Sequence, residues 1–453
     1  GSFSFANEAG ILDFMRTMTL FNNDVTLYYL NYDGRSEYTR DDLIPLAWFL
    51  LEDITISKRA GSLKLMDVRK SWNKKLPANV LTVEQFPYLE SDNASKPVPL
   101  MFGTWTVDAL CTNGALTTGE VEYKVCEYLD SVSRVDLYDG DTLVVSGANI
   151  SSSVLSEGII RVGNRGEGGK TFDARVTCTG YADTSVLGVI KQLEQLANDV
   201  AYTESFFDTS EIEAELGSLE TIAVYIDKQA ELYELIRQLQ EGCSNRFRYE
   251  VNAEGRRTAR LDNLDRASSA YVAKEEILEN ESMAIYTDKA TIAAKVKINW
   301  GKSGLEDTYQ TVIDESREGA VARSARETPQ IEFNTFLTTR EHAIARAALE
   351  AERLGQVRRF TDCTLRGERF LSLRIYDIIT VELLDEYREW AGTWNCQVLA
   401  IAPDTANEQN NVTLLLVERV ADLDDGKILR ITDTGAIRKT TTSDDIVRVT
   451  NGR

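Results

Sequence analysis

The segment that most resembles a chemical motif is the glycine-rich run from Asn164 to Thr171. Its last residues, Gly169-Lys170-Thr171, match the end of the phosphate-binding pattern GxxxxGK[ST], but Asn164 stands where the first glycine is required. Such a loop must also open a helix, so that backbone N–H groups face the phosphates. Because the residues from Thr171 to Thr177 have the composition of a strand, we predict a glycine-rich hairpin loop here and no nucleotide site.

His342 is the only histidine of the chain, which excludes multi-histidine metal sites within one copy. A Ser–His–Asp triad would have to use it, and the sequence contains no GxSxG motif to supply the nucleophile. His342 follows Glu341 at the polar end of an expected helix from Thr339 to Leu354. We therefore interpret it as a solvated helix residue.

Carboxylates are abundant, with 72 Asp and Glu residues, so a hydrolase that uses two acids stays open. The run from Asp136 to Asp141 resembles the start of a calcium loop, but its ligand order is wrong and no glutamate occupies the twelfth position. The run from Asp422 to Gly426 has the same ambiguity. In both places we favour a hairpin turn.

Aromatic residues could form a carbohydrate-binding or protein-binding surface, although ordinary filling of β-sheets explains each of them as well. The tryptophans considered are Trp72, Trp105, Trp300, Trp390 and Trp394.

The six cysteines never reach CxxC spacing, which argues against a zinc site. We expect small buried side chains in a reducing compartment, in preference to a disulfide framework. The cysteines are Cys111, Cys126, Cys178, Cys243, Cys363 and Cys396.

Charge limits the classes of partner. The net charge is −22, the opposite of what a protein needs to hold DNA or an anionic bilayer by its surface. The densest basic patch, Arg256-Arg257 with Arg260, is short and lies in an expected hairpin. No apolar run approaches the length of a membrane span, and Leu43 to Leu51 is interpreted as a buried strand.

With 453 residues and 43% hydrophobic residues, the chain is long enough for several domains. Alternating β-prone segments predict an N-terminal β domain (1–95) and a second β domain (96–182), with hairpins such as 53–57 with 62–68. The pattern predicts a helix from Val186, capped within Asp183 to Ser185, then another helix at about 227–240.

The hairpin 246–251 with 258–261 completes a small α+β module (183–270). A C-terminal β domain (271–425) follows with one helix (339–354), for which we expect a capping box from Thr338 to Glu341 and Gly355 at its end. Residues 426–453 lose hydrophobic periodicity and are expected to be a mobile tail or linker. The predicted fold class is β-rich α+β, in several domains.

The passage Lys96 to Gly103 (KPVPLMFG) resembles the entry of a β domain in proteins that form the hub at the tail tip or baseplate of tailed bacteriophages and phage-derived particles. The glycine-bounded pair Gly158 to Gly163 and Phe172 to Gly180 resembles the passage that leads into a helix. Arg340 to Gly355 followed by Phe370 to Val381 is similar to the hub-domain helix and its next strand, except that Tyr376 stands where glycine is more usual.

This resemblance implies β-barrel-like hub domains and a ring, commonly a trimer, that links the tail tube to distal or receptor-binding proteins. DNA would leave through such a ring without specific binding, and an acidic wall suits that passage. The implied location is the virion tail, assembled in the host bacterial cytoplasm. We assign no catalytic, cofactor-binding or metal-binding residue and expect no enzyme. A carbohydrate-binding or receptor-binding module, and less readily a tail-associated glycan hydrolase, stay open as alternatives.

Overall fold

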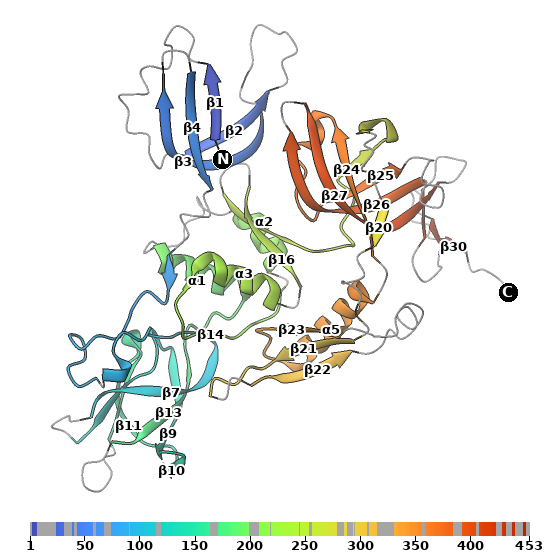
Figure 1. The fold of residues 1–453 in the computed structure, drawn as a ribbon. Coiled ribbons are helices and arrows are strands. Elements are labelled where there is room, and N and C mark those ends of the chain that lie inside the picture. The colour runs from blue at the N-terminus through green and yellow to red at the C-terminus, as the bar shows by residue number, and fades with distance from the viewer. Residues whose placement is uncertain are drawn as a thin grey trace.

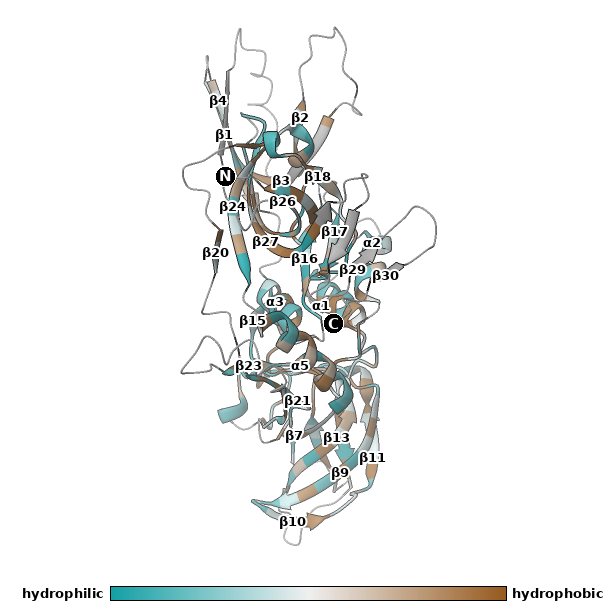
Figure 2. Ribbon diagram, turned by 90° about the vertical axis from the view of Figure 1, so that its right-hand side faces the viewer, coloured by the Kyte–Doolittle hydropathy of each residue, from teal (hydrophilic) through white to brown (hydrophobic). Residues whose placement is uncertain are grey.

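The computed structural model confirms a β-rich chain built from several sheets (Figure 1). The N-terminal and C-terminal sheets lie toward one end of the molecule, helices occupy the middle, and a seven-stranded sheet forms the other end (Figures 1 and 2). The residues described are 2–6, 24–30, 39, 43–57, 60–67, 74–89, 91–114, 119–163, 171–198, 208–217, 219–243, 245–252, 256–278, 285–287, 293, 295–305, 308–314, 330–355, 358–383, 392–404, 407–422, 428–431, 437–439 and 447–449.

The first sheet is antiparallel and has the strand order β1-β4-β3-β2. Its long strand β3 contains the apolar run that the sequence predicted to be a strand, and β3 forms the predicted hairpin with β4, where Thr55 pairs with Ser62. The strands are β1 (Ser2–Ala6), β2 (Asp24–Leu30), β3 (Leu43–Ile56) and β4 (Ala60–Asp67).

The second sheet has seven antiparallel strands in the order β10-β9-β13-β7-β8-β12-β11. Alternate side chains of its central strands, such as Leu137 and Val176, are fully buried in one apolar core. Gly158 precedes β12 with a φ of 59°, and a Cβ there would lie 1.9 Å from the carbonyl oxygen of Cys126. The strands are β7 (Thr104–Asn113), β8 (Val121–Lys124), β9 (Ser131–Asp139), β10 (Thr142–Val145), β11 (Ile150–Val154), β12 (Ile159–Val162) and β13 (Asp173–Thr179).

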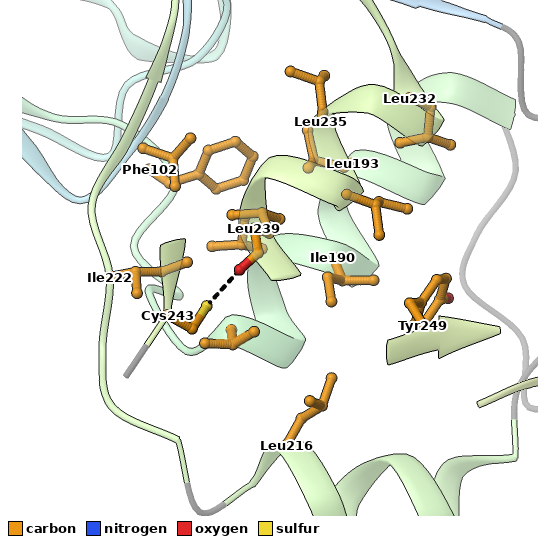
Figure 3. Packing of buried hydrophobic residues seen from close by; sticks show 14 of the residues in the cluster. Phe102, Ile190, Leu193, Leu216, Ile222, Leu232, Leu235, Leu239, Cys243 and Tyr249 are labelled. Atoms are coloured by element: carbon orange, nitrogen blue, oxygen red, sulfur yellow. Dashed lines mark hydrogen bonds between the residues drawn. The ribbon is translucent and has the colours of Figure 1, made fainter. Parts of the chain in front are cut away.

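A helical module joins the sheets. Figure 3 shows its core, where Leu193, Leu235 and Leu239 from two helices pack near Phe102, and the thiol of Cys243 donates a hydrogen bond to the carbonyl of Leu239. Its elements are β5 (Lys75–Leu76), β6 (Leu100–Phe102), α1 (Val186–Asn198), α2 (Thr209–Leu216), β14 (Val224–Ile226), β15 (Ala230–Glu231), α3 (Leu232–Gly242), β16 (Phe247–Val251) and β17 (Arg257–Leu261).

A smaller unit packs helix α5 (Arg340–Leu354) against a three-stranded sheet of β21 (Lys295–Trp300), β22 (Gln310–Asp314) and β23 (Gln330–Asn334). Ala343, Ala347 and Ala351 share one face of the helix and are buried with the sheet, because their small side chains allow close approach. Arg346 and Glu350 lie on the face of α5 next to these alanines.

The C-terminal sheet has β25, β26 and β27 at its centre, and its core contains Phe370, Ile379 and Val398. Its strands are β18 (Ala270–Val272), β19 (Ile277–Leu278), β20 (Ile285–Thr287), β24 (Arg359–Arg366), β25 (Ile378–Leu383), β26 (Gly392–Asp404), β27 (Gln409–Asp422), β28 (Ile428–Ile431), β29 (Ile437–Lys439) and β30 (Val447–Val449). Short 3-10 helices are η5 (Ser91–Asn93), η6 (Leu155–Glu157), η7 (Lys274–Glu276) and η9 (Glu368–Phe370).

Local predictions at the helix ends need correction. The second predicted helix begins at Leu232 and not near Asp227, because Ala230 pairs with Leu76 and keeps the backbone extended. Thr339, not Thr338, caps α5, and its hydroxyl accepts a hydrogen bond from the amide of His342 at 3.4 Å. The predicted cap of α1 is confirmed, with Ser185 Oγ accepting from the amide of Gly188 at 2.9 Å.

Two further segments differ from expectation. Helix α2 was not predicted; Asp208 caps it by accepting a hydrogen bond from the amide of Glu211. Where a mobile tail was expected, the short strands β28, β29 and β30 follow one another antiparallel and extend the C-terminal sheet. The domain boundaries stay a prediction.

Candidate functional site

The candidate site begins on strand β16, whose alternation gives it two faces. Phe247 and Tyr249 are buried in the core of the helical module, so Arg248 and Glu250 point to the opposite face, together with Arg246 just before the strand. This places two guanidinium groups and a carboxylate on one side of a strand near the centre of the molecule. We call the ionic cluster that gathers there the arginine junction. Its members are Arg246, Arg248, Arg260, Arg346, Arg353 and Arg374 with Glu211, Glu250, Asp262, Glu350 and Asp377.

Helix α5 brings the most deeply buried members of the arginine junction. The side chains of Arg346 and Glu350 are 0% and 1% exposed, and their nearest atoms lie 2.7 Å apart one helical turn from each other. Arg246, directly before β16, donates two hydrogen bonds to the same carboxylate, at 3.1 Å from Nε and 3.3 Å from Nη2. This bidentate pair between Arg246 and Glu350 fixes the position of α5 relative to β16.

Asp262, just after β17, links α5 to the C-terminal sheet. Nη1 of Arg353 lies 3.4 Å from its carboxylate, and Nη2 of the same arginine donates to its carbonyl oxygen. The side chain of Gln397 on β26 donates to Asp262 Oδ1 at 2.9 Å. Three segments that are distant in the sequence therefore meet at one residue.

The other half of the arginine junction lies around the turn that precedes β25. Arg374 donates to Glu250 on β16 at 3.0 Å and also binds Glu211 on α2. Arg260 on β17 lies 2.8 Å from Asp377, and both side chains are almost completely buried. These pairs join the turn 374–377 to both the hairpin and helix α2.

Burial and neighbouring charges shift the pKa values of the arginines. Burial lowers the pKa of Arg346 to about 10, although Glu350 opposes the change, while Arg246 and Arg353 lower it further. Burial likewise lowers the pKa of Arg358, against the attraction of Asp262. For Arg374 burial also acts downward, but Glu250 and Glu211 outweigh it and raise the pKa. Guanidinium groups in these surroundings stay charged at neutral pH.

A hollow of ≈ 210 Å³ opens beside the arginine junction, between α3 and the turn 374–377. Arg246, Arg248 and Tyr376 line it, together with residues of α3. Each carboxylate of the arginine junction already binds at least one guanidinium group. In the ranges described, no three metal-ligating side chains gather.

The motifs considered from the sequence are not brought together by the structure. Residues 164–170 of the glycine-rich run lie outside the described residues, and the segment after them is strand β13, as predicted. His342 is half-buried near the start of α5. Asp136 accepts hydrogen bonds from Arg134 and from the amide of Gly147, so it supports the predicted β9–β10 hairpin. The later acidic run extends beyond the described residues after Asp422.

The aromatic and cysteine residues fill cores. Trp105, Trp300 and Trp394 are each less than a tenth exposed, while Trp72 and Trp390 lie outside the described residues. Five of the six cysteines are buried, as the sequence predicted, and Cys111 is half-buried. Burial raises the pKa of Cys178 and of Cys243, each to about 12.

The sequence reasoning missed the arginine junction, although part of its signal was visible. Arg346, Glu350 and Arg353 have helical spacing, and Arg246 and Arg248 alternate on a strand. The basic patch considered for DNA is instead neutralised within the chain: Arg256 pairs with Asp208, Arg257 with Glu194, and Arg260 with Asp377.

Comparison with known proteins shows similarity in fold to phage tail proteins. No family model and no curated protein matches the sequence. Similar solved structures include a virion of a native gene transfer agent particle (TM-score 0.48, 14% identity, 73% of this chain and 87% of the other). Others are a prophage tail protein from Shewanella oneidensis (0.32, 12%, 70% and 98%) and one from Listeria monocytogenes (0.32, 10%, 68% and 87%). None of the described helices is long and apolar enough to span a membrane.

Proposed function

We propose that this chain is a structural component of a phage tail tip or baseplate hub. In this role copies form a ring, with a trimer as the expected form, that links the tail tube to distal or receptor-binding proteins and surrounds the DNA exit channel. The chain acts through shape and subunit contacts, and it is not an enzyme.

The observation that carries this proposal is that buried ion pairs connect elements from different parts of the chain. The buried ionic groups of the arginine junction join α2, β16, β17, α5, the turn 374–377 and β26 to one another. A network of this kind sets the orientation of several β units, and a component that contacts several partners in an assembly requires such fixed orientations.

Two further features support a hub. The passages that resemble tail proteins coincide with elements that connect units, since Lys96 to Gly103 contains β6, which pairs with β14, and Arg340 to Gly355 forms α5. The net charge of −22 gives a chain that repels DNA, and the candidate basic patch is neutralised by its own ion pairs.

Imaging of the intact particle tests the proposal. We expect this chain in a closed ring on the tail axis, because head-to-tail contacts between copies must close or polymerise. Light scattering of the isolated chain under assembly conditions should then give a discrete oligomer. A monomer in solution together with a position away from the tail axis in the particle contradicts the proposal.

Turnover assays test the non-enzymatic part. Purified chain incubated with peptidoglycan or bacterial polysaccharide should release no reducing sugar. Release that is lost when one of two neighbouring acids is changed to its amide would instead establish the hydrolase alternative.

A further inference from the structure

The hollow beside the arginine junction has the chemistry of an anion site. Arg246, just before β16, and Arg248 on β16 contribute two guanidinium groups, and Tyr376 contributes an aromatic ring from the turn 374–377. Tyr233, Gln240 and Glu241 of α3 line the other side. The side chains of Arg246 and Arg248 are 35% and 37% exposed, so a group from outside can reach both.

Both arginines keep donors available. Arg246 uses Nε and Nη2 on Glu350, and Arg248 uses Nε on Glu250. No described residue accepts a hydrogen bond from Nη1 of Arg246 or from either terminal nitrogen of Arg248. A planar guanidinium group offers five N–H donors, so each has unused donors at the hollow.

Positive charges gather behind the hollow. Arg246 and Arg353 act on both Arg346 and Arg358, while Glu350 and Asp262 attract these arginines. Burial is the largest cause of the lowered pKa values of Arg346 and Arg358, and repulsion between the arginines lowers them further. A further anion at the edge would relieve that repulsion.

We propose that this hollow is a carboxylate-binding site, and that it receives an Asp or Glu side chain from a second copy of the chain. Arginine pairs with a planar carboxylate through two parallel hydrogen bonds. The volume of ≈ 210 Å³ is below the roughly 300 Å³ at which pockets for drug-sized ligands begin, so it suits one side chain and not a nucleotide. Glu241 on the rim disfavours a doubly charged phosphate.

A second copy is the occupant that charge complementarity favours, because each copy carries 72 acidic residues against 50 basic ones. The inference rests on the proposed function in one respect only, namely that a ring places copies side by side. Binding of a small carboxylate to the isolated chain does not depend on that ring.

Thermal unfolding of the full chain with glutarate tests the site. At about 50 mM, glutarate should raise the unfolding midpoint by about 2 °C or more above sodium chloride of equal ionic strength. Arg248→Gln should abolish the difference and still fold, since Glu250 keeps its bond to Arg374. Arg237→Gln is the matched control, because Arg237 is an exposed arginine of α3 that pairs with Glu234 and does not line the hollow.

Three results would overturn the carboxylate site: equal midpoints in glutarate and chloride, an undiminished glutarate effect in Arg248→Gln, or a larger effect of inorganic phosphate.

Sedimentation equilibrium tests whether a second copy of the chain is the occupant. Arg248→Gln should weaken self-association of the chain about tenfold or more, while Arg237→Gln leaves it unchanged. Self-association that is absent, or equal in both variants, removes the second copy as occupant. The position of the chain in the intact particle still decides the hub proposal separately.

Discussion

The seven-stranded sheet and the arginine junction hold their strands together in opposite ways. In the sheet, Leu137 and Val176 are fully buried among apolar neighbours, and its ion pairs, such as Arg175 with Asp108, lie at the surface. In the arginine junction, Arg346 and Glu350 are buried as charges. Apolar burial is strong but non-directional, whereas a network of bidentate ion pairs fixes orientation and tolerates the loss of a member poorly.

The difference indicates a division of labour. The sheet is held by an apolar core, which also includes Met101 of β6 and packs against Tyr225 of β14. The arginine junction gains little net stability from its ion pairs but makes the relative placement of α5, β16 and the C-terminal sheet specific. Cys178 in the sheet and Cys243, which interacts electrostatically with Arg346, are buried thiols that can report on the two regions separately.

The largest effect is expected from Glu350→Ala. Removing this carboxylate leaves Arg346 buried beside Arg246 and Arg353, and breaking a buried ion pair in this way costs about 3–5 kcal/mol. Thiol labelling in urea should show faster modification of Cys243 and an unchanged rate at Cys178. Equal acceleration at both thiols would mean that the two regions unfold as one unit, against the division described above.

Leu137→Ala tests the same comparison by a change in the seven-stranded sheet. The substitution opens a cavity in the core of the seven-stranded sheet and should cost about 2–5 kcal/mol, independent of salt because no charge is involved. Labelling of Cys178 should accelerate while labelling of Cys243 stays as in the wild type. A cost that changes with sodium chloride concentration, or an effect confined to Cys243, contradicts the prediction.

A smaller effect is expected at the start of α5. Thr339→Ala removes the side chain that accepts from the amide of His342 and should destabilise the helix by about 1 kcal/mol. Thr338→Ala is the matched control, since this neighbouring residue is the cap that the sequence predicted, and it should have almost no effect. Hydrogen exchange of the amides of α5 measures both, and the reverse order would restore the predicted capping box.

The same contrast explains what the sequence could predict. Hairpins such as β16–β17 and β3–β4 were predicted because alternation and turn residues act over a few neighbouring positions. The arginine junction depends on partners that are far apart in the sequence: Arg246 and Glu350 are 104 positions apart, and Arg374 and Glu211 are 163 positions apart. Nothing in the local pattern of these residues says which acid each arginine meets.

The errors at helix boundaries have the same cause. Residues near Asp227 have helical periodicity, but pairing of Ala230 with Leu76, which is remote in the sequence, delays the helix to Leu232. Helix α2 has few apolar residues and depends on Asp208 at its start and on contact with β17. Burial of the tryptophans and cysteines, in contrast, follows from composition and was anticipated for the cysteines.

The smallest effect concerns an ion pair of the seven-stranded sheet that lies at the surface. Burial acts to raise the pKa of Asp136, but hydrogen bonds from Arg134 and from the amide of Gly147 outweigh it and hold the pKa below 3.8. Because the folded-state pKa is depressed, its contribution is complete above the unfolded-state pKa and is lost as the pH falls through the folded-state value. Hydrogen exchange of the β9–β10 hairpin should therefore accelerate only in acid, and Asp136→Asn should remove this pH dependence while leaving labelling of Cys243 unchanged. An NMR titration midpoint of Asp136 at or above 3.8 would show that its hydrogen bonds do not outweigh burial, and the surface pairs of the sheet would then contribute nothing to the comparison with the arginine junction.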